Sequence, residues 1–306
     1  MSERSVGGSE DQVAANRWFH SIDFGDFASS GRFRPGEPQN ITLYGTMDLL
    51  GHIDLHCADV LDVGAVDGLI SFGAVQLGAR RVVATDSVVR DGFLLARETL
   101  GLDVEYIPRV QIREFVEQFG RGSFDLIVCS GVIYHMLNPA SAFFECRKLL
   151  KEHGLLIVES AYESRSDRAA IFVNSEEELF VEPNTYSMPT KRAIVGLMRL
   201  ACLDVLAVRT IAGPDRITVL GRAVAPAAVK DRTALTRRIH DVDFCDFDFQ
   251  IKRFLPSPAT STIRYSGPAD EQAIDHHDYQ PDFPFHPPRH RRTVGTTAWS
   301  TADGNR

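Results

Sequence analysis

The chain has 306 residues, a formal net charge of −8 at pH 7, 44% hydrophobic residues and 24% charged residues. These values fit one large globular domain, with or without extensions. They disfavour a nucleic-acid partner, because no sequence-wide basic surface is available for phosphates. The five cysteines lack Cys-x-x-Cys spacing, which predicts free thiols in a reducing compartment. No signal peptide or membrane-length apolar run is visible, so we expect a cytoplasmic protein without membrane contact.

The segment 17–33 is rich in aromatic residues and too irregular for a strand. We interpret it either as a strap packed over the core or as a lid of aromatic side chains over an active site. Residues 41–50 are predicted to form a short helix that leads to the first strand. Residues 1–50 would together form an N-terminal extension that carries this lid.

A glycine-bearing turn, residues 64–68, follows the short apolar run 58–63. The amphipathic stretch 69–77 comes next and ends at a glycine in the position of a helix C-cap. A second apolar run then ends at Asp86. Strand, turn, helix, strand and acid in this order are the opening unit of a doubly wound nucleotide-binding fold. The spacing from Asp62 to Asp86 is close to the ~20 residues expected between such a turn and a ribose-binding carboxylate.

Strands and helices continue to alternate after Asp86, which predicts a parallel sheet with right-handed crossovers. The predicted elements are helix 91–100, strand 104–107, strand 124–130, helix 139–151 ended by Gly154, strand 155–159 and helix 191–203. Two last strands, 205–211 and 216–224, would form an antiparallel pair that closes the sheet. We therefore predict a Rossmann-like, doubly wound seven-stranded α/β core over residues 51–225.

Residues 226–306 are predicted to form a C-terminal arm. A helix is expected over 226–240, and residues 244–249 alternate aromatic and acidic side chains like a half-buried strand. From Pro256 onward the chain is rich in Pro, His, Asp and Thr without lasting periodicity. We expect an irregular arm that either wraps the domain or joins two chains in a homodimer. The histidines of this arm lack tight ligand spacing on a fixed scaffold, so no metal site is predicted.

The glycine turn indicates which nucleotide is bound. A dinucleotide site requires G-x-G-x-x-G, but Val66 and Leu69 stand where its second and third glycines would be. The run from Asp62 to Gly68 instead resembles the D-x-G-x-G-x-G turn of class I S-adenosylmethionine-dependent methyltransferases, with Val66 in place of the middle glycine. An ordinary strand-to-helix turn is the alternative interpretation of this segment.

Three further segments resemble one branch of these methyltransferases. The run Gly-Val-Ile-Tyr-His at 131–135, followed by Asn-Pro at 138–139, is similar to a segment of the bacterial tRNA wobble-uridine carboxymethyltransferases and their small-molecule-methylating relatives. The N-x-Y-x-x-P-T run at 184–190 and Trp-Phe-His-Ser-Ile at 18–22 also match that family. The resemblance covers residues 18–224 with the motifs in order, and it implies S-adenosyl-L-methionine as cofactor.

The resemblance and the predicted strand ends together assign candidate site residues. Asp86 would hold the ribose, Val110 and Gln111 would flank the adenine, and an aromatic ring can favour the sulfonium cation. The candidate cofactor-binding residues are Asp62, Gly64, Ala65, Gly68, Asp86, Ser87, Val110, Gln111, Ser130, Gly131 and Tyr44. The candidate substrate-binding residues are Trp18, His20, Asn184 and Tyr186.

Two candidate catalytic residues, Tyr134 and His135, follow the fourth predicted strand. Tyr134 would wall the pocket. His135 has the right pKa class to take a proton from a hydroxyl or amine acceptor. A half-buried histidine that is hydrogen-bonded to the backbone and only orders its loop is the alternative for His135.

Three functions stay open at this point. The first is methyl transfer to an oxygen or nitrogen of a small molecule, such as a specialised metabolite. The second is tRNA modification by methyl or carboxymethyl transfer. The tRNA enzymes hold a carboxylated cofactor with a lysine before the first strand and a basic residue after the Tyr-His pair. Here residues 36–60 contain no Lys or Arg and Met136 follows His135, which favours plain S-adenosylmethionine. The third is a catalytically inactive cofactor-binding or assembly protein, which Val66 and the long arm motivate.

Overall fold

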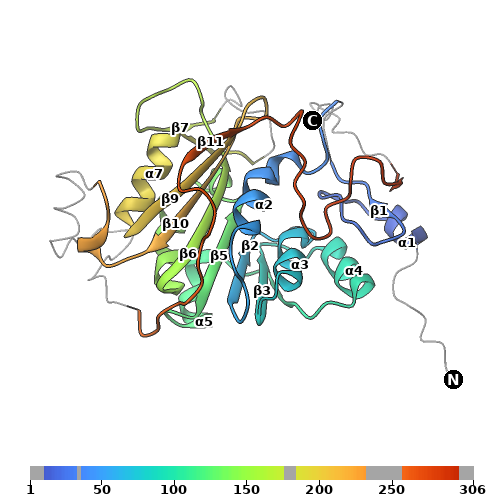
Figure 1. Cartoon of the computed structure of the whole chain (residues 1–306), viewed down its shortest axis with the longest axis horizontal. Helices are drawn as coiled ribbons and strands as arrows, with labels where there is room; N and C mark the ends of the chain where they lie inside the picture. Colours follow the sequence, from blue (N-terminus) through green and yellow to red (C-terminus); the bar gives the residue numbers. More distant parts are fainter. Residues whose placement is uncertain (1–9, 33–35, 176–183, 232–256, 296–306) are drawn as a thin grey trace.

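The computed structural model describes residues 10–32, 36–175, 184–231 and 257–295. Its main sheet has the strand order β11-β9-β10-β6-β5-β2-β3-β4. These strands are β2 (Asp59–Val63), β3 (Arg81–Asp86), β4 (Glu105–Pro108), β5 (Phe124–Ser130), β6 (Leu150–Ala161), β9 (Leu203–Ile211), β10 (Arg216–Ala223) and β11 (Glu271–Ile274). Strands β2 to β6 run parallel, and β10 lies antiparallel between β6 and β9. The predicted doubly wound α/β fold is confirmed (Figure 1).

Helices cover both faces of this sheet. They are α1 (Glu10–Ala15), α2 (Tyr44–Gly51), α3 (Leu69–Gln76), α4 (Asp91–Leu100), α5 (Phe115–Phe119), α6 (Ala140–Leu149) and α7 (Lys191–Leu200). Single 3-10 turns are η1 (Ile41–Leu43), η2 (Ile112–Glu114), η3 (Ile133–His135) and η4 (Pro226–Ala228). Successive side chains of a strand point to opposite faces. Val60 of β2 therefore packs with α2, α3 and α4, whereas Leu61 packs with α5, α6 and α7.

The sheet has one strand more than the predicted seven. The seven core strands are present, and β11 joins the edge of the sheet by pairing in parallel with β9. This additional strand comes from the C-terminal arm, whose composition carries no periodic signal for a strand. Pairing covers the hydrogen-bonding groups of the β9 edge, which would otherwise stay open.

The boundary between α6 and β6 corrects a second expectation. Helix α6 ends at Leu149 and β6 begins at Leu150, so the strand runs through Gly154, which was expected to follow the helix. The Lys151 ammonium binds Asp125 Oδ2 at 2.6 Å and Asp59 Oδ2 at 3.1 Å on the neighbouring strands. A Cβ atom at Gly154 would lie 2.9 Å from the Asp125 carbonyl oxygen, so this glycine permits a close approach of two strands.

The described part of the arm wraps the domain. From β11 it passes α2 and α3 and reaches the N-terminal segment, where β12 (Thr293–Val294) pairs in parallel with β1 (Ala28–Ser29) (Figure 1). Phe283 is buried against Gly73 of α3 on the way. The expected helix 226–240 is described only as far as η4, and the expected strand 244–249 lies outside the described residues. The homodimer stays a prediction.

A buried arginine ties this arm to the sheet. Arg209 of β9 donates to Asp48 Oδ2 of α2 at 2.7 Å and to the side-chain and main-chain oxygens of Asp270 at 3.2 Å. Its Nη2 also lies 3.4 Å from the Tyr265 hydroxyl. Since a buried cation is stable only with such partners, helix, sheet and arm are held together at this point.

We expect Phe283→Ala to lower the free energy of unfolding by about 2–4 kcal/mol, because the ring fills the space above Gly73 and its removal leaves a cavity. Urea titration followed by circular dichroism would measure the loss. Val173→Ala is the control, since that side chain is exposed and its change should stay within about 0.5 kcal/mol. Equal stability of both variants would contradict a packed arm.

Candidate functional site

One cavity of about 690 Å³ lies at the edge of the sheet where the parallel strands end. Parallel strands end at a common edge, so the segments after β2, β3, β5 and β6 converge there. The predicted site residues that line the cavity are Asp62, Gly64, Ala65, Asp86, Ser87, Val110, Gln111, Ser130, Gly131, Tyr134, His135, His20 and Asn184. The structure therefore brings together residues that span more than half of the chain.

Four predicted site residues do not line this cavity. Gly68 lies in the turn with φ +90°, and its missing side chain leaves room for Phe72. Tyr44 is buried under the arm, where its ring meets Tyr279 and His286 edge-on. Trp18 and Tyr186 are the other two.

Trp18 lies behind the cavity, and Tyr186 lies beside it. The Trp18 indole is buried and donates to the Val13 carbonyl at 2.8 Å, and the ring lines a neighbouring cavity. The Tyr186 side chain is exposed, while its backbone N–H donates to the Tyr134 carbonyl at 2.9 Å. In this conformation Trp18 supports the lid from behind and Tyr186 fixes the loop that carries Tyr134.

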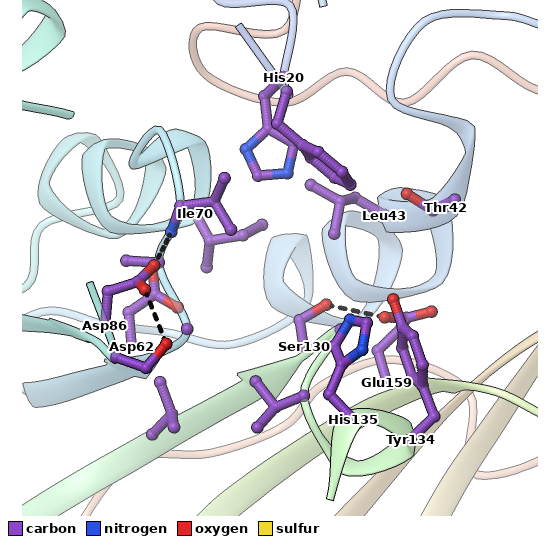
Figure 2. Close-up of a pocket in the computed structure, with 18 of the residues that line it drawn as sticks. His20, Thr42, Leu43, Asp62, Ile70, Asp86, Ser130, Tyr134, His135 and Glu159 are labelled. Carbon is purple, nitrogen blue, oxygen red and sulfur yellow. Dashed lines mark hydrogen bonds between the residues drawn. The ribbon is translucent and has the colours of Figure 1, made fainter. Parts of the chain in front are cut away.

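Two acidic residues of the cavity, Asp62 and Asp86, lie on one side of it, and Glu159 lies on the other side near Tyr134 and His135 (Figure 2). The Asp86 carboxylate, at the end of β3, accepts from the backbone N–H groups of Val66 at 3.2 Å and Val88 at 3.1 Å and from Arg90 Nε at 3.2 Å. Burial raises the pKa of Asp62 to about 7, and the Ser71 hydroxyl donates to its Oδ2 at 2.6 Å. These hydrogen bonds fix the Asp86 carboxylate at the wall of the cavity, where it can accept hydrogen bonds from a polyhydroxylated ligand.

Val66 adopts φ +52°, the left-handed conformation that its glycine counterpart would adopt without strain. For a β-branched residue this conformation costs on the order of 1–3 kcal/mol. The hydrogen bond from the Val66 N–H to Asp86 holds it there. The side chain lines the cavity without closing it, so the blocked site on which the inactive-protein hypothesis depends is not observed.

His135 lies on η3 at the opposite side of the cavity. Its Nδ1 is 2.8 Å from the Asn184 carbonyl oxygen, which can only accept, so Nδ1 carries the proton. In the neutral ring this leaves the Nε2 lone pair available to a ligand. A hydrogen bond to the backbone was the mark of a histidine that only orders its loop. The same hydrogen bond also orients the ring so that Nε2 could accept a proton, as the orienting partner of a catalytic histidine does.

A buried ion pair forms the floor beside His135, and the sequence pattern did not single it out. Arg216 Nε lies 2.6 Å from Glu159 Oε1, and Nη2 lies 2.9 Å from Oε2. The guanidinium also lies 4.8 Å from the centroid of the Tyr134 ring, and Ser130 Oγ donates to Glu159 Oε2 at 3.2 Å. Although burial opposes the charged form, Glu159 raises the already high pKa of Arg216, so the guanidinium keeps its charge. The only sequence signal was a charged residue at an end of each of two apolar strands.

The lid covers the cavity from above. The backbone N–H groups of Phe19 and His20 donate to Asp67 Oδ2 at 2.5 and 2.8 Å. Figure 2 shows the His20 imidazole over the cavity, between Ile70 and Leu43. Burial lowers the pKa of His20 to about 3, so the ring is neutral, and its Nδ1 has no hydrogen-bond partner among the described residues. The segment packs over the core and contributes Phe19, His20 and Arg32 to the cavity lining, and its role as an active-site lid stays a prediction.

The arm holds the outer side of the lid. Asn40 exchanges two hydrogen bonds with the Ser21 backbone, at 2.8 and 2.9 Å, and its Nδ2 lies 3.0 Å from His286 Nδ1 of the arm. Because Asn40 Nδ2 only donates, His286 Nδ1 accepts. Asp23 pairs with Arg291, and the Asp23 N–H donates to the Phe285 carbonyl at 2.7 Å. Burial lowers the pKa of His286 to about 4.

Metal sites and membrane-spanning helices can be assessed only for the described residues. Within them, no group of three or more His, Cys, Asp or Glu side chains is arranged to hold a metal ion. In the same part of the chain, every helix is too short or too polar to span a membrane.

The comparisons with known proteins agree with this geometry. Residues 61–158 match the family model described as a methyltransferase domain. The chain is 31% identical over 130 residues to the ubiquinone biosynthesis O-methyltransferase of Glaesserella parasuis, covering 40% of this chain and 54% of that protein. It is 27% identical over 160 residues to the tRNA U34 carboxymethyltransferase of Campylobacter curvus, covering 48% of this chain and 49% of that protein. The chain thus spans about half the length of these curated relatives.

A solved structure is also similar, the 1,6-didemethyltoxoflavin-N1-methyltransferase of Burkholderia thailandensis with its bound substrate and S-adenosylhomocysteine. The identity is 17% and the TM-score is 0.48, and the match covers 60% of this chain and 79% of that one.

We expect Glu159→Gln to lower the free energy of unfolding by about 3 kcal/mol, because it leaves the Arg216 charge buried without its counter-ion. The double variant Glu159→Gln/Arg216→Met removes both charges and should recover most of that loss. Urea unfolding of the three proteins measures both effects. A double variant less stable than the single one would show that the charges themselves stabilise the fold.

Acid should loosen the contact between arm and lid through His286. Its folded pKa of about 4 lies below the unfolded value of 6.5, so its contribution to stability is complete above pH 6.5 and is lost as the pH falls toward 4. At pH 5 the loss is about 2 kcal/mol. His286→Asn should therefore lose less stability than the wild type between pH 7 and pH 5. The exposed His277→Gln is the control, and it should follow the wild type.

Proposed function

We propose that this class I, S-adenosylmethionine-dependent methyltransferase transfers its methyl group to an oxygen or nitrogen atom of a small molecule. The matched domain, residues 61–158, contains the glycine turn, Asp86 and the segment with Tyr134 and His135. The observation that carries the proposal is the cavity itself, which is lined by Asp62 and Asp86 on one side, by His135 on the other, and by Phe19 and His20 of the predicted lid. Its volume of about 690 Å³ suits a cofactor together with a small acceptor.

The residues present fit S-adenosylmethionine, which supplies a methyl group on a sulfonium sulfur. Asp86 would accept hydrogen bonds from the ribose hydroxyls, since its carboxylate is anchored by the turn and directed at the cavity. Val110, Ile112 and Phe115 supply apolar walls for a flat base. The backbone of Gly64 and Ala65 would face the amino-acid part.

The other half of the cavity would hold the acceptor. His135 Nε2 would take the proton that a hydroxyl or amine loses as it attacks, while the Asn184 carbonyl keeps Nδ1 protonated. Tyr134 would wall the pocket, with its ring fixed by Arg216. His20 and Phe19 of the lid would exclude water and align the acceptor for an in-line attack.

Modification of tRNA is the second candidate, and one observation favours it. Arg32, Arg90 and Arg216 line the cavity, although no Lys or Arg stands at the positions where the family places cations for a carboxylated cofactor. The net charge of −8 and the lid over the cavity oppose a polyanionic acceptor. Small-molecule methylation remains the better-supported function.

Calorimetric titration with S-adenosylhomocysteine tests the cofactor site. We expect binding in the micromolar range or tighter, and a loss of at least about 100-fold in Asp86→Asn, because the ribose hydroxyls lose a carboxylate that accepts from both of them. Asp91→Asn, an exposed acidic residue of α4, is the matched control and should bind normally. Equal affinity of Asp86→Asn and the wild type would rule out Asp86 as the ribose ligand.

The acceptor class can be tested by methyl transfer from labelled S-adenosylmethionine to a panel of phenols, catechols, alcohols and amines, with unmodified tRNA in parallel. We expect label in the small molecules. His135→Gln should lower kcat by about 100-fold or more while leaving S-adenosylhomocysteine affinity unchanged, because only proton transfer is lost. Label found only in tRNA would favour the second candidate. An unchanged kcat would assign His135 to loop structure alone.

A further inference from the structure

Asp67 connects the cofactor turn to the lid. It lies in the turn between Val66 and Gly68 and is buried. Its Oδ2 accepts two consecutive backbone N–H groups of the lid, from Phe19 at 2.5 Å and His20 at 2.8 Å. Hydrogen bonds to a carboxylate are stronger than those between neutral groups. Two of them on one oxygen fix the orientation of the backbone segment that donates them.

The same turn touches the acid predicted to hold the ribose. The residue next to Asp67, Val66, donates its N–H to Asp86 Oδ2 at 3.2 Å. The N–H groups of Gly64 and Ala65 donate to the Thr85 carbonyl, one residue before Asp86, at 2.9 and 3.0 Å. The attachment of the lid and the attachment to the cofactor acid are therefore adjacent in the chain, separated by a single peptide bond.

The lid is rigid enough to transmit a change at this point. The backbone of His20 and Ser21 packs against Gly31, where any side chain would collide with it. The Ser21 hydroxyl accepts the Gly31 N–H at 2.8 Å, and Asn40 holds the Ser21 backbone from outside. At its cavity end this unit carries the His20 ring, whose Nδ1 has no hydrogen-bond partner in the part of the chain that the structure describes. A buried nitrogen without a hydrogen-bond partner is energetically costly, and a bound ligand could supply the missing partner.

We propose that Asp67 is a positioning residue that couples occupancy of the cofactor site to closure of the lid over the acceptor half. A ligand that binds Asp86 orders the turn, and the ordered Asp67 carboxylate then fixes Phe19 and His20 above the acceptor. This inference rests on the acceptor role proposed above for the lid. Coupling between two sites is reciprocal. If the bound cofactor favours the closed lid by a given factor, loosening the lid must weaken cofactor binding by up to the same factor.

Trp18 makes the coupling measurable. It is buried next to Phe19, and the chain has two tryptophans, so Trp299→Phe leaves Trp18 as the single reporter. Acrylamide quenching of Trp18 would be measured with and without S-adenosylhomocysteine, and affinity would be measured by calorimetry. In the parent protein the ligand should reduce quenching. In Asp67→Asn we expect stronger quenching, little response to the ligand, and about tenfold weaker binding.

Two further variants separate coupling from general destabilisation. Asp91→Asn removes a charge that lines the neighbouring cavity together with Phe19 and Asp67, and it should behave like the parent. Gly31→Ala disturbs the lid without touching the turn, and it should also weaken S-adenosylhomocysteine binding. A purely structural role would lower the unfolding temperature while preserving both the ligand response of Trp18 and the affinity.

The outcomes also distinguish this inference from the proposed function. Normal binding with an unchanged Trp18 response in both Asp67→Asn and Gly31→Ala would overturn the coupling alone. A parent protein that does not bind S-adenosylhomocysteine would contradict the proposed function, and the coupling would fall with it.

Discussion

The site depends on the common edge at which five parallel strands end. This geometry places the turn after β2, the acid at the end of β3 and the loop after β5 around one cavity, although they are far apart in the chain. The turn is the most constrained part of that edge. Asp62, Asp67 and Asp86 gather there, and burial raises the pKa of Asp62 and Asp67 because the charged forms lose water. Backbone N–H groups and the Ser71 hydroxyl offset that cost, and in doing so they fix the shape of the turn.

Buried charge also organises the rest of the molecule. Arg216 and Glu159 form an ion pair beside His135, and Arg209 gathers α2, β9 and the arm around one guanidinium. Removing one member of such a group costs more than replacing the whole group by apolar side chains. These ion pairs therefore specify which segments meet, and Arg216 in addition sets the orientation of the Tyr134 ring that faces the cavity.

The two ends of the described chain close the site together. The lid is held from inside by Asp67 of the turn and from outside by His286, Arg291 and β12 of the arm. Under the proposed function, access for an acceptor competes with both sets of contacts. The arm therefore acts on the site indirectly, through the lid. Asn40 links the two, because it lines the cavity and binds both Ser21 of the lid and His286 of the arm.

The sequence by itself determined the parts whose signals are local. Apolar runs ended by Gly64 and Asp86 specified the βαβ unit, and most of the cofactor-side candidates line the cavity, because a strand end places its next residues at the sheet edge. Only tertiary structure decided the rest. Glu159 and Arg216 lie 57 positions apart, and no sequence pattern pairs them. The segment of β11 has no periodicity that predicts a strand, and it becomes one by pairing with the edge of β9. Tyr44 was assigned to the cofactor from its place in the chain, whereas the arm covers it with Tyr279 and His286. Such contacts depend on packing between distant segments and on the desolvation of charges. The position of a residue in a single sequence does not reveal either of them.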